Sequence, residues 1–211
     1  PFTVTVDERF PALGVAYQIR DRFQMVPPTS APITLTIDPG VTLKLGGPLA
    51  SNPSIILGSG SGPTNTFPVR LAAAGTTAAP IKITSGAATP MPGDWAAIDW
   101  QGGPPAGNVM TNVTVEYGGA SAATNGFGCG PGDNSSLLLI TDWRPDDAFV
   151  QNCTFAHSAS GAIVSGWSSD SAGPNLKPTN TFTDIAQACQ VTQPKTAAGT
   201  CPGNDAIVDC Y

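Results

Sequence analysis

The sequence predicts an all-β protein with the right-handed parallel β-helix fold, a solenoid with loop insertions at the corners of its coils. Its 24 glycines and 21 prolines among 211 residues exclude a helix-rich protein, because both residues are disfavoured in helix interiors. The apolar residues fall instead in short runs rich in β-branched side chains. Similar motifs recur along the chain at irregular intervals, as expected when each coil of a solenoid contacts only its neighbours.

The expected strands are short and fill a single domain, 1–211. Residues 1–32 are expected to form an N-terminal cap or first coil. Strands then follow at 33–37, 41–45, 55–57, 69–71, 81–84, 96–100, 113–117, 137–140, 153–155, 162–165, 181–183 and 206–210. Weak helical patterns occur at 7–17 and 183–189. A β-sandwich is disfavoured, because the one Asn-Gly pair, Asn125 and Gly126, lies in a long polar segment and not in a tight hairpin.

One class of motif places a β-branched or aromatic core after a polar residue, at 81–85, 112–117, 152–157 and 180–184. If these segments stack in register, they form three rows of side chains. The internal row comprises Ile83, Val115, Phe155 and Phe182. The outward row comprises Thr114, Thr154 and Thr181, and the row two positions beyond the internal one comprises Tyr117, His157 and Asp184. Parallel pairing would then repeat each row at about 4.8 Å per coil.

A second class of motif ends in an aromatic residue, at Trp100, Trp143, Trp167 and Tyr211. Trp143 and Trp167 are 24 residues apart, which fits one coil, whereas the flanking intervals are 43 and 44 residues. The longer intervals predict loop insertions at 118–136 and 186–205. A column of these aromatic side chains would pack in the core or, if exposed, would form a ligand-binding platform on which sugars stack.

Charge and hydropathy argue against two kinds of partner. The formal net charge is −6, and nine Lys and Arg residues supply no basic stripe for nucleic acid phosphates or an anionic membrane surface. No apolar run approaches the roughly 18–20 residues that a membrane-spanning helix needs, so no transmembrane segment is expected.

The five cysteines indicate an oxidising, extracytoplasmic compartment. Without a Cys-x-x-Cys pair, and with a single histidine in the chain, they do not form a zinc site. Cys189 and Cys201 bracket a polar segment with proline and glycine, which predicts a disulfide between them. Cys153 is the expected unpaired, buried thiol, because it lies on the same, core-facing side of its strand as Phe155. How Cys129 and Cys210 pair stays open.

Five segments carry a family resemblance: ITLTIDPGVTLKL (33–45), LAAAGTTAAPIKITS (71–85), PGDWAAIDW (92–100), NVTVEYGG (112–119) and VQNCTFAHSASGAI (150–163). They resemble the bacterial surface and secreted β-helices of the pectin-lyase-like superfamily, which are often lipoproteins. In those proteins a Gly-Thr-x-x-x-Pro-Ile segment leads into a Trp-containing strand and then a Val-x-x-x-Tyr-Gly-Gly strand. The resemblance implies the fold and an extracellular or cell-surface location. It does not specify an activity, because the superfamily includes lyases, hydrolases and adhesins.

The richest polar cluster is the segment Asp142-Trp143-Arg144-Pro145-Asp146-Asp147. Carboxylates of Asp142, Asp146 and Asp147 could bind Ca²⁺ through oxygen ligands. Alternatively, Asp146 and Asp147 could act as a catalytic acid and base, with Arg144 and His157 as further catalytic candidates. In the polygalacturonases that this Asp pair resembles, a histidine in a Gly-His-Gly motif follows about one coil later. In this chain His157 follows Asp147 by only 10 residues and lies in Ala-His-Ser, so a solvated turn is the simpler interpretation.

Three functions remain from the sequence. The favoured one is a non-catalytic extracytoplasmic module, without a cofactor, that binds a neutral glycan or a cell-surface protein. The alternative is a polysaccharide lyase or glycoside hydrolase that uses the 142–147 region. A weaker alternative is an ice-binding solenoid, suggested by the outward threonines but interrupted by Lys82 and Glu116. The first is favoured because a lyase needs several converging acids and bases, and the chain has one such cluster.

Overall fold

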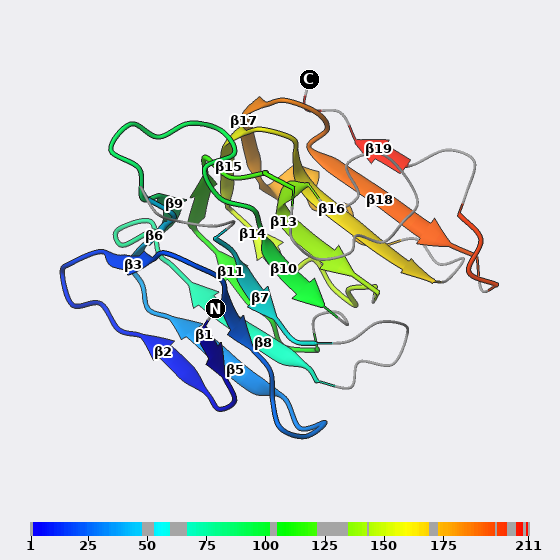
Figure 1. Ribbon diagram of the computed structural model, residues 1–211. Helices are drawn as coiled ribbons and strands as arrows, with labels where there is room; N and C mark the ends of the chain where they lie inside the picture. The colour runs from blue at the N-terminus through cyan, green and yellow to red at the C-terminus, as the bar shows by residue number, and fades with distance from the viewer. Residues whose placement is uncertain are drawn as a thin grey trace.

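Parallel strands stack into three sheets, which we call A, B and C, and the three sheets together form a parallel β-helix (Figure 1). The computed structural model describes residues 2–47, 53–59, 67–101, 105–121, 135–142, 144–168, 173–196, 198–201, 206–208 and 210. The chain visits sheet A, then B, then C, and repeats this order through five coils; in the sixth, no described strand joins sheet B between residues 168 and 181. Among the described strands, every pair is parallel except the last, which joins Gln190–Lys195 to Ala206–Val208, so the predicted fold class is confirmed.

Neighbouring strands within a sheet come from successive coils, apart from that last pair. Sheet A contains β1 (Phe2–Val4), β4 (Phe23–Met25), β7 (Ile55–Leu57), β10 (Ile98–Gln101), β13 (Ser136–Thr141), β16 (Gly161–Ser168), β18 (Gln190–Lys195) and β19 (Ala206–Val208). Sheet B contains β14 (Val150–Gln151), β11 (Val109–Thr111), β8 (Val69–Ala74), β5 (Ile33–Ile37) and β2 (Glu8–Phe10). Sheet C contains β17 (Thr181–Ile185), β15 (Thr154–Ser158), β12 (Val113–Glu116), β9 (Ile81–Ser85), β6 (Thr42–Leu45) and β3 (Tyr17–Ile19).

Helix is confined, within the described residues, to one short 3-10 turn, η1 (Lys177–Thr179). No helix in this part of the chain is long and apolar enough to span a bilayer. The weak helical patterns at 7–17 and 183–189 were therefore wrong, since β2 and β17 occupy parts of those segments. Residues 2–32 contain β1 to β4, which make one complete coil and begin the next.

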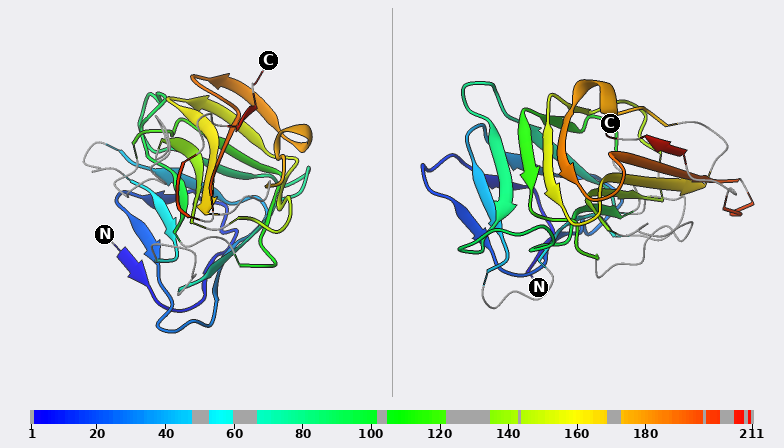
Figure 2. Two further views of the ribbon diagram at one scale, coloured as in Figure 1. Left: turned by 90° about the vertical axis from the view of Figure 1, so that its right-hand side faces the viewer. Right: turned by 90° about the horizontal axis from the view of Figure 1, so that it is seen from above.

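The two ends of the stack are built differently, as the turned views show (Figure 2). At the C-terminal end β18 pairs in parallel with β16, and β19 turns back to pair antiparallel with β18. The insertion predicted at 186–205 is thus not wholly a loop, because β18 lies inside it. The other predicted insertion, 118–136, falls largely outside the described residues.

The predicted disulfide between Cys189 and Cys201 is wrong. Cys189 bonds Cys210, with the two Cα atoms 4.9 Å apart and a sequence separation of 21 residues. Cys189 directly precedes β18, and antiparallel β19 returns the chain to the start of that strand, where Gln190 pairs with Val208. The sequence contains no signal for this reversal. Cys201 also takes part in a disulfide.

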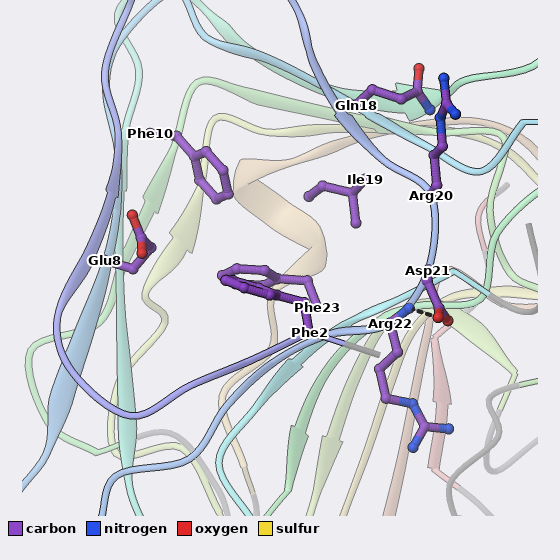
Figure 3. Close-up of a pocket in the computed structure, with 9 residues that line it drawn as sticks. All are labelled: Phe2, Glu8, Phe10, Gln18, Ile19, Arg20, Asp21, Arg22 and Phe23. Carbon is purple, nitrogen blue, oxygen red and sulfur yellow. Dashed lines mark hydrogen bonds between the residues drawn. The ribbon is translucent and has the colours of Figure 1, made fainter.

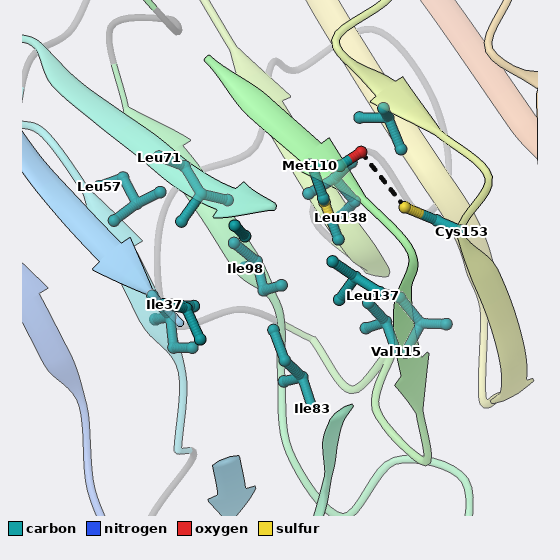
Figure 4. Packing of buried hydrophobic residues seen from close by; sticks show 14 of the residues in the cluster. Ile37, Leu57, Leu71, Ile83, Ile98, Met110, Val115, Leu137, Leu138 and Cys153 are labelled. Atoms are coloured by element: carbon teal, nitrogen blue, oxygen red, sulfur yellow. Dashed lines mark hydrogen bonds between the residues drawn. The ribbon is translucent and has the colours of Figure 1, made fainter. Parts of the chain in front are cut away.

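The internal row predicted from the motifs is confirmed. Ile83, Val115, Phe155 and Phe182 pair in succession across β9, β12, β15 and β17. Ile83, Val115 and Phe155 are fully buried, and the rings of Phe155 and Phe182 stack with centroids 5.5 Å apart. Figure 4 shows Ile83 and Val115 among the core side chains that fill the space between the sheets. Each coil therefore buries its apolar face on the coil before it.

Cys153 is the free, buried thiol that the sequence predicts. Its Sγ lies 3.3 Å from the carbonyl oxygen of Met110, as the dashed line in Figure 4 shows, and 3.3 Å from that of Gln151. Burial raises the pKa of this thiol to about 11, against the lowering effect of its backbone hydrogen bonds. Cys153 is therefore an unreactive core residue in the folded protein.

Candidate functional site

A row of three polar side chains marks the corner at which sheet C ends and the chain turns toward sheet A. Tyr117 follows β12, His157 lies in β15 and Asp184 lies in β17. The register of these strands aligns the three, as the motifs predict. The rings of Tyr117 and His157 stack with centroids 4.7 Å apart and planes 13° apart. His157 Nδ1 lies 2.8 Å from Asp184 Oδ2. We call these three residues the corner row.

The backbone of the corner row is left-handed in all three coils. Tyr117 has φ 64°, His157 has φ 51° and Asp184 has φ 53°. Such a conformation costs a residue with a side chain about 1–2 kcal/mol, whereas glycine adopts it freely. The row therefore keeps a tyrosine and a histidine where glycine would be less strained. Asn112, Asp142 and Asn152 at other corners are also left-handed, but asparagine and aspartate tolerate this conformation better than tyrosine and histidine do. The cost at Tyr117 and His157 therefore favours a functional role for this corner.

The hydrogen-bonding state of His157 follows from its partner. A carboxylate only accepts hydrogen bonds, so the Nδ1 atom of His157 carries the proton that it shares with Asp184. In the neutral ring Nε2 is then an acceptor, and it bonds to no described residue. The His157 side chain is 36% exposed, so a ligand can reach it. The ring of Tyr117 covers one face of the imidazole, so a ligand would contact His157 at the edge of its ring, where Nε2 lies.

Beside the corner row, threonine hydroxyls repeat once per coil on the outer face of sheet C. Thr114 pairs with Thr154, and Thr154 pairs with Thr181. Their neighbours along the strands, such as Val113 and Val115, are buried, so the threonines point outward. We call Thr114, Thr154 and Thr181 the threonine column.

Earlier coils extend the threonine column with a neutralised charge pair. Lys82 takes the same position one coil before Thr114, and Thr42 takes it one coil earlier still. Lys82 Nζ lies 2.7 Å from Glu116 Oε1, and the hydroxyl of Thr84 donates to the same oxygen at 2.7 Å. These two charges offset each other, and Lys44, two positions beyond Thr42 on the same outward side of β6, is a further exposed charge on this face.

The structure separates the residues that the sequence proposed as a catalytic or Ca²⁺ site. Arg144, Asp146 and Asp147 lie in the turn between β13 and β14, at the corner between sheets A and B. Arg144 and Asp146 approach to 3.9 Å as an exposed ion pair. His157 lies at the corner between sheets C and A, with Tyr117 and Asp184 as its partners. The catalytic candidates therefore do not converge.

The turn between β13 and β14 encloses little space. Asp146 and Asp147 line a cavity of about 10 Å³ together with Phe149, which is room for about one water. Asp142 directly follows β13 and has φ 71°. Within the described part of the chain, no group of three or more His, Cys, Asp or Glu residues is placed to hold a metal ion.

Trp100 and Trp167, the two members of the predicted aromatic column that the structure describes, do not align with each other. Trp100 pairs with Ile140, and Ile140 pairs with Ser165, whereas Trp167 pairs with Pro194. The strands pair so that their apolar residues align. The aromatic residue that ends each motif lies a different number of positions beyond those apolar residues, so Trp100 and Trp167 do not align. Trp100 is fully buried and Trp167 is 2% exposed, so neither belongs to a surface platform for sugars. Trp143 and Tyr211 lie outside the described residues.

A cavity of about 520 Å³ lies at the N-terminal end of the stack (Figure 3). Phe2, Phe10 and Phe23 form its apolar part, and Phe2 is 64% exposed. The side chains of Arg20 and Arg22 extend away from these rings in Figure 3. Phe10 and Phe23 also pack against the core of the following coils, so the apolar part of this cavity is the end of the core, and the polar residues Glu8, Gln18, Arg20, Asp21 and Arg22 complete its lining.

Comparisons with models of protein families, with curated proteins and with solved structures found no match. The functional argument therefore depends on the outer face of sheet C and its corner row. The sequence aligned Tyr117 and Asp184 but gave them no binding role, and it connected the threonines only with the weaker ice-binding alternative. The sequence feature that points to these residues is their repetition, because in each coil the corner residue follows the threonine by three positions.

Proposed function

We propose that this chain is a non-catalytic, extracytoplasmic β-helix module that binds neutral glycans on the outer face of sheet C. The observation that carries the proposal is the corner row running beside the threonine column. Sugars are recognised by arrays of hydroxyl, amide and imidazole groups that hydrogen-bond their hydroxyls, and by few charged groups when the sugar is neutral. The pairing of Lys82 with Glu116 removes a free charge that would favour an ionic ligand.

The expected extracytoplasmic location supports this proposal. The disulfide between Cys189 and Cys210 is typical of proteins in oxidising compartments, where glycans of cell surfaces and cell walls are available. The resemblance to bacterial surface β-helices of the pectin-lyase-like superfamily points to the same location, and surface attachment belongs to the proposal. With a net charge of −6, long-range repulsion opposes acidic polysaccharides more than neutral ones.

A binding panel tests the proposal. The protein is run by affinity electrophoresis through gels that contain soluble β-glucan, xyloglucan, galactomannan, polygalacturonate or alginate. We expect retardation by at least one neutral glycan and by neither acidic one. His157→Asn should weaken retardation, because asparagine tolerates the left-handed backbone but lacks the ring. Thr36→Val is the matched control, because Thr36 lies on the outside of sheet B.

Two outcomes would contradict the proposal. Absence of retardation by every neutral glycan would reject the glycan-binding function. Release of unsaturated uronate or of reducing ends, lost in Asp146→Ala or Arg144→Ala, would instead support the lyase or hydrolase alternative. The ice-binding alternative predicts thermal hysteresis, which we do not expect, since Lys82 and Glu116 interrupt the flat array of threonines.

A further inference from the structure

We propose that two copies of this chain associate through the N-terminal ends of their solenoids, related by a two-fold axis perpendicular to the solenoid axis. This contact uses the first coil, residues 2–23, which we call the N-terminal face, and leaves the outer face of sheet C free. Three features of the N-terminal face carry the proposal: open strand edges, exposed apolar side chains and a balanced set of charges.

Each of the three strands of the first coil is the edge strand of a sheet. In the described structure β1, β2 and β3 pair only with β4, β5 and β6 of the next coil. An edge strand presents peptide groups that can pair with a strand of another chain. At the opposite end of the stack, antiparallel β19 closes sheet A and the disulfide between Cys189 and Cys210 fixes it there. Among the described residues, the N-terminal face has no such closing strand.

Exposed apolar side chains gather on the same coil. Six large hydrophobic residues are exposed in the described part of the chain, and four of them fall within residues 2–15: Phe2, Val6, Leu13 and Val15, each at least 63% exposed. The ring of Phe2 stacks on that of Phe23 with centroids 6.1 Å apart, and both line the cavity at this end (Figure 3). Exposed apolar surface that is gathered in one place and bordered by polar groups marks a site of protein association.

The charges around this apolar centre favour a second copy as the partner. The cavity lining contains two acids, Glu8 and Asp21, and two bases, Arg20 and Arg22. A balanced set of charges attracts neither a strongly acidic nor a strongly basic partner, but it can be complementary to itself across a two-fold axis. An apolar centre with a charged rim is also the usual composition of a protein interface. The first coil matches the roughly 20–30 residues that each side of a stable interface contributes.

The two-fold arrangement brings complementary parts of the N-terminal face together. The symmetry axis passes through β1 and through the corner between β2 and β3, so β1 would pair antiparallel with β1 of the partner subunit, and β2 with its β3. The start of β2, at Glu8, then faces the end of β3, where Arg20 of the partner subunit lies. The apolar corner with Leu13 and Val15 meets its own counterpart on the axis. A head-to-tail contact would instead continue into an open filament.

A charge swap tests the proposal. The full chain, with any purification tag at its C-terminus, is analysed by sedimentation velocity between about 1 and 100 μM, because interfaces of this size dissociate at micromolar concentrations or below. We expect a species of twice the 21.4 kDa of one chain. Glu8→Arg should raise the dissociation constant at least about 10-fold, since it sets two arginines together, and Glu8→Arg combined with Arg20→Glu should restore it. Asp147→Arg, in the exposed turn between β13 and β14, is the matched control and should leave the dimer unchanged.

Phe2→Glu provides a second variant that does not open the core, since Phe2 is 64% exposed. It should also weaken the dimer at least about 10-fold, because it places two like charges in the apolar centre. A monomer at every concentration would overturn the proposal, as would a dimer or larger assembly that Glu8→Arg and Phe2→Glu leave intact. A dimer that the combined swap does not restore would overturn the two-fold arrangement. Glycan binding is tested separately by the gel panel and does not depend on these results.

Discussion

His157 Nδ1 lies 2.8 Å from the Oδ2 atom of Asp184, although the two residues are 27 positions apart in sequence. The parallel register of β15 and β17 produces this contact, because each residue of one coil lies beside its counterpart in the next. The contact fixes the proton of the imidazole on Nδ1 and leaves Nε2 as an acceptor for a ligand hydroxyl. A structural repeat thus provides a defined hydrogen-bonding group on an exposed face.

The coupling between His157 and Asp184 can be measured in a double-mutant cycle. We expect Asp184→Asn to weaken glycan binding by about 3- to 10-fold, since its amide can donate to Nδ1 and favour the wrong tautomer. In a His157→Asn background the same change should have little further effect, because the partner is already absent. The measurement is the dissociation constant for the best neutral glycan of the panel. Additive losses would show that the two residues act independently.

The internal row should dominate the stability of the coils. Phe155 is fully buried and stacks on Phe182. We expect Phe155→Ala to lower the free energy of unfolding by about 3–5 kcal/mol, through lost burial and the cavity left behind. Phe182→Ala should cost less, because Phe182 is only partly buried. Urea unfolding followed by circular dichroism measures both, and a loss below about 1 kcal/mol for Phe155→Ala would contradict the observed packing.

The disulfide between Cys189 and Cys210 should hold β19 on the last coil. Its removal in the double variant C189S/C210S should lower the free energy of unfolding by about 2–4 kcal/mol, because a loop closed over 21 residues restricts the unfolded chain. Peptide mapping without reduction should recover a cross-linked peptide pair that contains Cys189 and Cys210. A pair that joins Cys189 to Cys201 instead would show that β19 does not return beside β18.

The buried thiol of Cys153 makes stability depend on pH in the alkaline range. Its pKa is raised in the folded state to about 11, from an ordinary value of 9.0. The folded state therefore keeps the proton longer than the unfolded state does. This contribution is fully present below pH 9 and is lost as the pH rises toward 11. We expect unfolding free energy to fall by roughly 2–3 kcal/mol across that window. Cys153→Ala should remove this part of the fall; an unchanged pH profile would contradict the burial.

The sequence predicts the fold and the rows of sheet C well, and it does so for a physical reason. Motifs such as NVTVEY and NCTFAH carry their apolar core and their corner residue at a fixed offset, so aligning Val115 with Phe155 also aligns Tyr117 with His157. The same reasoning found the buried thiol of Cys153, because strand parity determines which side chains face inward.

Predictions that depended on loops and on chain reversals failed. Cys189 was matched with Cys201 because the two bracket a short segment, but β19 turns back and brings Cys210 to Cys189. The aromatic column failed because pairing follows the apolar core, which sets Trp100 beside Ile140. The cluster around Asp146 was predicted from its density of charged residues and from its adjacent aspartates, whereas the residues of the corner row are spread over three coils and are not close together in sequence.

The central claim is that the outer face of sheet C binds a neutral glycan, and backbone amide spectra test it most directly. The ¹⁵N-labelled protein is titrated with the neutral glycan that binds most tightly, and shifts are followed for each assigned amide. We predict perturbations centred on Thr114, Thr154, Thr181 and His157, with Thr36 on sheet B unaffected. Perturbations confined to Phe10 and Phe23 at the N-terminal cavity, or to Arg144 and Asp146, would contradict the account.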